Sequence, residues 1–580
     1  MNTEHPACHS NNDDNGAGTS GRYSRGVLSL TNIVLVLLVF LALYLPFIDK
    51  AFQIDDYAFI HLSHRIGWNP LIALPENWGN DGKILSGFLP YEITHPLLVS
   101  YIIKIFIAIF GEHEISLHLA FMIFPLISIF SLIKLNEILF PASRHIVVLL
   151  ALFFCSIPAF LVNAQNLMAD VPTLALIFLA LAGFMYGMER ESPKMIYMGG
   201  CALTLAVFCS YHAGFFIPLI LLYALLIRRF DRHMAISLAL PVVALLIWLM
   251  AVYYLYGLFP LIKSKSGEAR SITDFVEGGL RINALINKIV SMVSFIGAAM
   301  IWVLPLHYAL KKAFTRFLLL LVPATAACHA ATFRLTGYEF SRSLFFSLFV
   351  ALGLLTFATV VQVVWSRVKE GRAYQRELFL LLWFLIVIGY LILFFPFSSA
   401  RYLLPAFPPV LMLLMNDPAW SFTTKARRIA IACVLCASLL FALASVFSDY
   451  TYADTYRNYS AQVKEFRAIN GNNFNVWYVG EWGMRYYMDR GGAKYLYSNL
   501  NEPLKGDYVV IPEMPRLWVP SPDVQKRMVL FAEKSYSSRL PLRLFNRKSQ
   551  AGFYCNAWGM LPFAFSYEPD EVFTVYKVVN

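Results

Sequence analysis

Long apolar stretches separated by short polar segments run along most of the chain, from about residue 28 to residue 447. A helix needs about 20 mostly apolar residues to cross the hydrocarbon core of a bilayer, and most of these stretches have that length. The pattern predicts an α-helical polytopic membrane protein. We expect thirteen spans, near residues 28–48, 115–139, 146–166, 171–188, 195–211, 213–228, 235–257, 289–310, 317–333, 343–365, 377–397, 402–415 and 429–447.

Two apolar stretches do not have the length of one span. Residues 195–230 would form a helix of about 54 Å against a core of about 30 Å. We therefore predict a hairpin that turns at Tyr211–Gly214. Residues 95–110 are too short to cross and begin next to a proline, which indicates an interfacial or re-entrant helix.

The two ends of the chain are more polar. Residues 1–27 read as a cytoplasmic, disordered N-terminus and not as a signal peptide, because no small-residue cleavage site follows the first apolar run. Residues 448–580 show shorter periodic segments and predict a small α/β domain. Its expected elements are helices over 454–469 and 481–490, the second ended by Gly491 and Gly492, and strands over 476–479, 508–511 and 572–578.

Charge fixes the expected orientation. Only 14% of the residues are charged, where a soluble domain has about 25%. One set of short loops carries sixteen Lys and Arg residues and the opposite set carries three, Arg334, Arg342 and Arg401. By the positive-inside rule the first set is cytoplasmic. Residues 49–114, residues 258–288 and the tail then share the outer face of the membrane, opposite the cytoplasm.

Composition also excludes several classes. The net charge of +11 comes from these loop clusters, and no basic-aromatic patch or zinc-finger spacing indicates a nucleic-acid partner. Of the eight cysteines, only Cys8 and Cys555 lie outside predicted spans, so no disulfide framework is expected. No phosphate-binding loop of an ATP-driven pump is present.

Two adjacent carboxylates, Asp55 and Asp56, follow the first span. A neighbouring negative charge and a low dielectric can raise the pKa of one of them towards the working pH of a general base. The structural alternative is a hydrated acid pair that caps a helix. On the sequence alone this alternative is at least as good.

Glu92 and His95 lie in the same outer segment, directly before the interfacial helix. A carboxylate and an imidazole three residues apart could ligate a divalent metal ion, the one cofactor that the residues suggest. Alternatively, Glu92 binds the acceptor, Thr94 caps the helix, and His95 only hydrogen-bonds at the interface.

Three further candidates lie at the outer ends of spans. Asp170 precedes Val171 and Pro172 and is either a helix cap or a third catalytic carboxylate. Arg401 and Arg342 are the candidates for binding a donor phosphate, since a guanidinium binds phosphate through paired hydrogen bonds. A lone arginine at a helix end can also simply reach towards the membrane surface.

The order of these segments resembles the GT-C glycosyltransferases, and within them the bacterial protein O-mannosyltransferase and aminoarabinose-transferase superfamily. The acidic pair, the Glu92…His95-Pro96 stretch and Gly111–Glu114 carry the resemblance in the first outer segment. Asp170-Val171-Pro172, Arg401…Pro405 and Glu481–Tyr487 carry it further along the chain. The family usually has Asp-Glu at Asp55-Asp56. Aminoarabinose transferases have a lysine where this chain has Ile93, which counts against a lipid A acceptor.

This resemblance implies an inverting transfer of a sugar, a hexose or a pentose, from a polyprenyl-phosphate donor to a hydroxyl acceptor on a protein, a lipid or a glycan, at the periplasmic face of a bacterial inner membrane. It implies that Asp55 is the general base and Arg401 the phosphate-binding residue, and that a glutamate at the place of Glu92 can bind metal. The alternative is a secondary transporter or lipid flippase, which would place ionisable residues near the middle of its spans. Here the acids lie at the outer ends.

Overall fold

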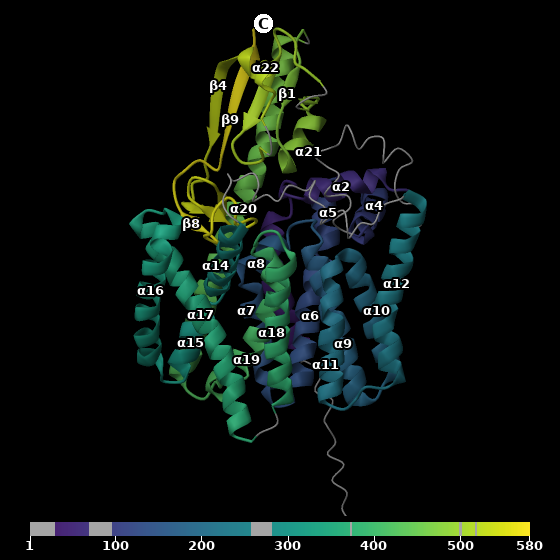
Figure 1. Ribbon diagram of the computed structural model, residues 1–580, viewed down its shortest axis with the longest axis vertical. Coiled ribbons are helices and arrows are strands. Elements are labelled where there is room, and N and C mark those ends of the chain that lie inside the picture. The colour runs from purple at the N-terminus through teal and green to yellow at the C-terminus, as the bar shows by residue number, and fades with distance from the viewer. Residues whose placement is uncertain are drawn as a thin grey trace, which may run out of the picture.

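The computed structural model describes residues 30–68, 96–256, 281–371, 374–471, 473–497, 501–516 and 519–579. A bundle of long helices forms one layer, and a smaller domain made of the C-terminal residues lies on one end of the bundle (Figure 1). We call this end the tail face. The helices α2 (Asp56–Arg65), α4 (Leu98–Phe110) and α5 (Glu114–Phe121) also lie there.

Eight helices of the described residues are long and apolar enough to cross a membrane. Their apolar side chains face both the bundle interior and its surface, as expected where lipid replaces water as the surrounding solvent. They correspond to α1 (Leu30–Tyr44) with the short turn η1 (Leu45–Phe47), α5 with α6 (Ile123–Leu139), α9 (Asp170–Arg190), α12 (Arg232–Tyr256), α16 (Phe314–Thr336), α17 (Phe340–Lys369), α18 (Gln375–Phe394) and α20 (Lys425–Asn470).

The remaining predicted spans correspond to shorter or broken helices. One is a pair bent by 56°, α14 (Arg281–Ala299) and α15 (Val303–Leu310). The others are α7 (Val147–Cys155) with α8 (Pro158–Asn163), α10 (Pro193–Cys209), η4 (Tyr211–Phe215) with α11 (Phe216–Leu226), and η6 (Arg401–Ala406) with α19 (Phe407–Met415). Each of the thirteen predicted spans thus has a helical counterpart, and the predicted hairpin turn is η4. The α-helical membrane fold is confirmed, with eight helices of spanning length among the described residues, or nine if the bent pair is one span, and the count of thirteen spans stays a prediction.

Helix α20 differs from its prediction in length. The span expected to end at residue 447 and the tail helix expected from residue 454 form one continuous helix of 46 residues. At a rise of 1.5 Å per residue, this helix is about 69 Å long, more than twice the thickness of a bilayer core. The predicted boundary between the membrane domain and the tail therefore falls inside a rigid helix, which leaves no linker between them.

The tail contains a five-stranded sheet in the order β2-β1-β3-β9-β4. The expected strands appear as β1 (Val476–Tyr478), β3 (Tyr508–Pro512) and β9 (Glu571–Val578), and the expected second helix as α21 (Trp482–Arg490). Strand β1 is parallel to β2 (Lys494–Tyr495) and β3, whereas β9 is antiparallel to β3 and β4 (Met528–Tyr536). The expected α/β domain is confirmed.

The orientation of the bundle remains a prediction that cysteine labelling can test. We expect Gly67→Cys and Asp523→Cys, both exposed positions on the tail face, to react with a membrane-impermeant maleimide in intact spheroplasts. Thr423→Cys, exposed at the opposite end, should react only after lysis and serves as the matched control. Labelling of Thr423→Cys in intact cells, or protection of either tail-face position, would contradict the orientation that the loop charges predict.

Candidate functional site

Three of the predicted site residues meet at the tail face although they are far apart in sequence. Asp55 precedes α2, Asp170 is the first residue of α9, and Arg401 is the first residue of η6. The Nη2 atom of Arg401 lies 2.8 Å from Oδ2 of Asp55, and its Nε atom lies 3.8 Å from Oδ2 of Asp170. We call these three residues the acid–arginine cluster.

The cluster is nearly but not completely closed to solvent. The exposed fractions of the side chains are 12% for Asp55, 13% for Asp170 and 7% for Arg401. Arg401 is therefore not reaching out to the membrane surface. Asp55 makes no side-chain capping hydrogen bond to α2, and both carboxylates benefit from the partial positive charge of a helix N-terminus.

Arg401 has hydrogen-bonding capacity that the described residues do not use. Its Nη2 also donates to the hydroxyl of Tyr402 at 3.2 Å, and its Nη1 contacts the sulfur of Met168. Its Nε–H is buried and has no hydrogen-bond partner among the described residues. A buried unpaired donor costs free energy, on the order of 1–3 kcal/mol, which a bound acceptor atom would recover.

Asp56 has a different environment from its neighbour. It is fully buried, and its two oxygens accept hydrogen bonds from the backbone N–H of Leu167 at 2.8 Å and of Gln53 at 3.0 Å. Burial raises the pKa of Asp56 to about 7, against the opposing effects of the Lys50 charge and of these two N–H groups. Asp56 ties the start of α2 to the turn before α9, so its geometry fits a structural role better than a catalytic one.

This pKa gives a prediction for stability. Between about pH 4 and pH 7 the unfolded chain ionises Asp56 while the folded protein keeps it protonated, so rising pH favours the unfolded state across this window. Asp56→Asn lacks this titration. We expect the melting temperature of Asp56→Asn, relative to wild type, to rise from pH 4 to pH 7 and to stay constant above. A difference independent of pH would contradict this assignment.

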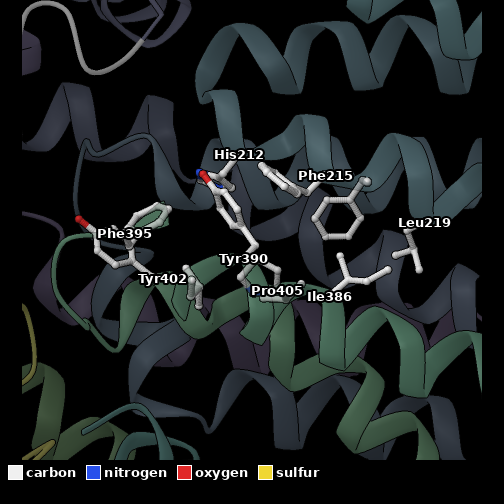
Figure 2. A pocket seen from close by; sticks show the side chains of 11 residues that line it. His212, Phe215, Leu219, Ile386, Tyr390, Phe395, Tyr402 and Pro405 are labelled. Atoms are coloured by element: carbon white, nitrogen blue, oxygen red, sulfur yellow. The ribbon is translucent and has the colours of Figure 1, made fainter. Parts of the chain in front are cut away.

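An apolar cavity begins next to the cluster. It is lined by η4 and α11 on one side and by α18 and η6 on the other, and Tyr402, the neighbour of Arg401, forms part of its wall (Figure 2). From Phe395 to Ile386 the wall follows α18 for nine residues, roughly 13 Å into the bundle. Apart from His212, Tyr390 and Tyr402, its lining is purely apolar.

The other predicted site residues do not join the cluster within the described structure. Arg342 lies at the start of α17, where its Nη1 donates to the backbone carbonyl of Lys548 at 3.0 Å. Glu92 and His95 lie outside the described residues, so their roles stay predictions. The described residues contain no group of three or more His, Cys, Asp or Glu side chains that could hold a metal ion.

Several residues around the cluster were not predicted. Lys50 is fully buried and pairs with Asp449 of α20 at 2.5 Å, and it also donates to Asn166 at 2.5 Å. Tyr402 forms part of the cavity wall and accepts a hydrogen bond from Arg401 of the cluster. Nothing in the local sequence marks these residues, although a lysine at the end of a predicted span is a weak signal of a buried partner.

These features define a polytopic membrane protein with a polar site and an apolar cavity at one end of its helix bundle. Residues 94–256 match the family model described as dolichyl-phosphate-mannose-protein mannosyltransferase, a segment that covers less than half of the chain. The match confirms the resemblance to the GT-C glycosyltransferases. No curated protein matches the chain in sequence.

Three solved structures are similar to the chain at low sequence identity. ArnT from Cupriavidus metallidurans in the apo state is 13% identical, with a TM-score of 0.43, over 86% of this chain and 96% of ArnT. The same protein bound to undecaprenyl phosphate gives 13% and 0.40, over 87% and 96% of the two chains. The Archaeoglobus fulgidus oligosaccharyltransferase tethered with an acceptor peptide gives 12% and 0.42, over 80% of this chain and 63% of that protein.

Proposed function

We propose that this protein transfers a sugar from a polyprenyl-phosphate carrier to a hydroxyl acceptor at the tail face of the membrane. The observation that carries the proposal is the position of the acid–arginine cluster at the start of an apolar cavity. Such a site places a base, a cation and an apolar surface for a lipid chain next to one another, as the reaction requires.

Asp55 is the proposed general base. The acceptor hydroxyl is a poor nucleophile until its proton is removed, and a carboxylate within hydrogen-bond reach can take that proton as the new C–O bond forms. The bond from the sugar to the phosphate oxygen breaks in the same step, and the polyprenyl phosphate leaves. Attack opposite the leaving phosphate inverts the configuration at the sugar carbon. The ion pair with Arg401 fixes the direction in which the Asp55 carboxylate points.

Arg401 is the proposed contact of the leaving phosphate. Negative charge grows on the phosphate as the bond breaks, and a preorganised N–H donor in a nearly dry site stabilises it. The buried Nε–H without a hydrogen-bond partner supports this role. Asp170, 3.8 Å from the same nitrogen, holds the guanidinium from the other side. Arg342 is the second candidate, and the variants discussed below separate the two.

The cavity is the proposed start of the path for the first isoprene units of the donor; its volume of about 20 Å³ is that of one water molecule, so its side chains must move apart to admit the chain. Its aromatic and aliphatic lining matches a hydrocarbon chain, and Tyr402 lies at the junction between the polar and the apolar part. A divalent ion held by Glu92 and His95 is a further proposal. Elemental analysis of the purified protein, with transfer measured before and after chelation, tests it, and a metal-free protein with unchanged activity would overturn it.

Transfer of radiolabel tests the proposed function. Purified protein is incubated with a panel of undecaprenyl-phosphate-linked radiolabelled hexoses and pentoses, together with membrane and soluble fractions as acceptors. We expect at least one donor to label protein, lipid or glycan, and the labelled fraction identifies the acceptor class. No transfer from any donor, together with sugar-lipid movement across vesicles, would support the transporter instead.

A further inference from the structure

A segment of the tail, Phe553–Asn556, hydrogen-bonds to the three residues that precede Arg401. The N–H of Ala400 donates to the carbonyl of Phe553 at 2.9 Å, and the N–H of Asn556 donates to the carbonyl of Ser398 at 3.0 Å. The Oδ1 atom of the Asn556 side chain accepts from the N–H of Ser398 at 2.9 Å. The hydroxyl of Ser399 also donates to the Phe553 carbonyl, at 3.2 Å. Four hydrogen bonds thus join the tail to the connection between α18 and η6.

This connection carries the catalytic arginine. Ser398, Ser399 and Ala400 are all buried, and Arg401 follows without any intervening residue. On the side towards the bundle, Lys288 of α14 donates to the carbonyls of Ile392 and Phe395 at 2.6 and 2.8 Å and so holds the end of α18. The position of the Arg401 guanidinium therefore depends on a backbone segment that α14 holds on the bundle side and the tail holds on the opposite side.

Tyr554 belongs to the same tail segment and connects it to the turns that precede Asp55 and Asp170. Its buried hydroxyl donates to Oδ1 of Asp449 at 2.9 Å and accepts from Asn166 at 3.2 Å and from Gln53 at 3.1 Å. Asn166 lies in the turn before Asp170, and Gln53 lies two residues before Asp55. One tail segment therefore hydrogen-bonds to the backbone before Arg401 and to side chains of the two turns that precede Asp55 and Asp170.

We infer that Asn556 and Tyr554 are positioning residues for the acid–arginine cluster, so that the tail domain completes the site instead of being a separate module. This inference rests on the proposed function. Asn556 acts through the backbone of Ser398–Ala400 on Arg401, and Tyr554 acts through Gln53 and Asn166 on the two carboxylates. Neither side chain touches the donor.

Asn556→Ala isolates the effect of the Asn556 side chain on the position of Arg401. It removes the acceptor for the Ser398 N–H and leaves the two backbone hydrogen bonds in place. Asn556→Asp keeps an oxygen acceptor at the same position and should behave as wild type. Asn473→Ala, at an exposed asparagine of the same domain, is the matched control.

The readout is binding of undecaprenyl phosphate to the full-length protein in detergent, together with a double-mutant cycle. We expect Asn556→Ala to weaken binding about tenfold, a coupling typical of residues that share one network. In the Arg401→Lys background the same change should have little further effect, because the arginine that it positions is already gone. A residue that only stabilised the tail would weaken binding by the same factor in both backgrounds.

Each outcome decides one question. Unchanged binding by Asn556→Ala, or an effect that adds fully to that of Arg401→Lys, would overturn the inference while the proposed function stands. Failure of the wild type to bind undecaprenyl phosphate more tightly than dodecyl phosphate would contradict the proposed function itself. If Asn556→Ala does not fold, Tyr554→Phe, with Tyr567→Phe as its exposed control, is measured for sugar transfer in a cycle with Asp55→Asn. Because Tyr554 acts on the carboxylates, its effect should largely disappear in the Asp55→Asn background, and an effect that adds fully would overturn the inference.

Discussion

Asp55→Asn is expected to transfer sugar about 10²–10⁴-fold more slowly than the wild type, because an amide cannot take the proton of the acceptor hydroxyl. Asparagine is close in size to aspartate and keeps an oxygen that can accept from Arg401, so the geometry of the cluster should survive. Donor binding should therefore change little while kcat falls. The measurement is the rate of radiolabel transfer at saturating donor, with donor affinity determined separately.

Asp523→Asn is the matched control for this change. Asp523 lies in the tail domain, its side chain is 83% exposed, and it pairs with Lys526 on the same short helix. We expect wild-type transfer from this variant. Near-normal transfer by a folded Asp55→Asn protein would show that Asp55 is not the base, and Asp170 would then be the remaining carboxylate of the cluster.

Arg401→Lys is expected to lower transfer about 10²-fold, the usual cost of removing one donor that stabilises developing charge. Lysine keeps the positive charge but has no planar fork, so one ammonium cannot reach Asp55, Asp170 and a phosphate oxygen together. Donor affinity should fall with the rate, in contrast to Asp55→Asn. The two variants are compared in the same transfer and binding assays.

Arg342→Lys is the matched comparison for Arg401→Lys, because Arg342 is the other arginine that the sequence analysis proposes as a contact of the donor phosphate. In the structure it donates to the backbone of Lys548, and it makes no ion pair with Asp55 or Asp170 among the described contacts. We expect Arg342→Lys to retain wild-type transfer. Loss of transfer in Arg342→Lys together with normal transfer in Arg401→Lys would reverse the two assignments.

Much of the fold could be predicted because the bilayer constrains sequence so strongly. A span must be apolar over most of its length, so each of the thirteen expected spans has a helical counterpart, including the hairpin at Tyr211–Gly214. Broken spans such as α7 with α8 have the same composition as straight ones. The breaks are caused by local turns, for example at Pro158. A hydropathy profile averaged over a window of residues does not show such turns.

The continuity of α20 and the strand β4 were harder to predict. The apolar run of α20 changes to polar residues near Ser448, which looks like the end of a helix although the backbone hydrogen bonds continue to Asn470. Residues 529–535 of β4 are exposed on both faces of the strand, so the alternation of buried and exposed positions that marks a strand is missing.

The sequence predicts which residues of the site lie on the same face of the membrane. It does not predict the distances and contacts between them. The orientation rule places Asp55, Asp170, Arg401 and Arg342 together at the tail face. Only the packing of α9 and η6 against the start of α2 shows that Arg401 pairs with Asp55 while Arg342 contacts the tail. The role of Tyr554, more than 380 residues from Asn166, could not be read from spacing because sequence distance carries no information about such contacts.

The most direct test of the central claim follows the donor and the acceptor together in one vesicle preparation. Wild-type protein and Asp55→Asn are reconstituted with an undecaprenyl-phosphate sugar that carries label in both the sugar and the lipid. We predict that the wild type releases undecaprenyl phosphate in equal amount to the glycosylated acceptor, with inverted configuration at the sugar carbon, and that Asp55→Asn releases almost none. Donor that stays intact, or that moves to the other leaflet without losing its sugar, would contradict the account.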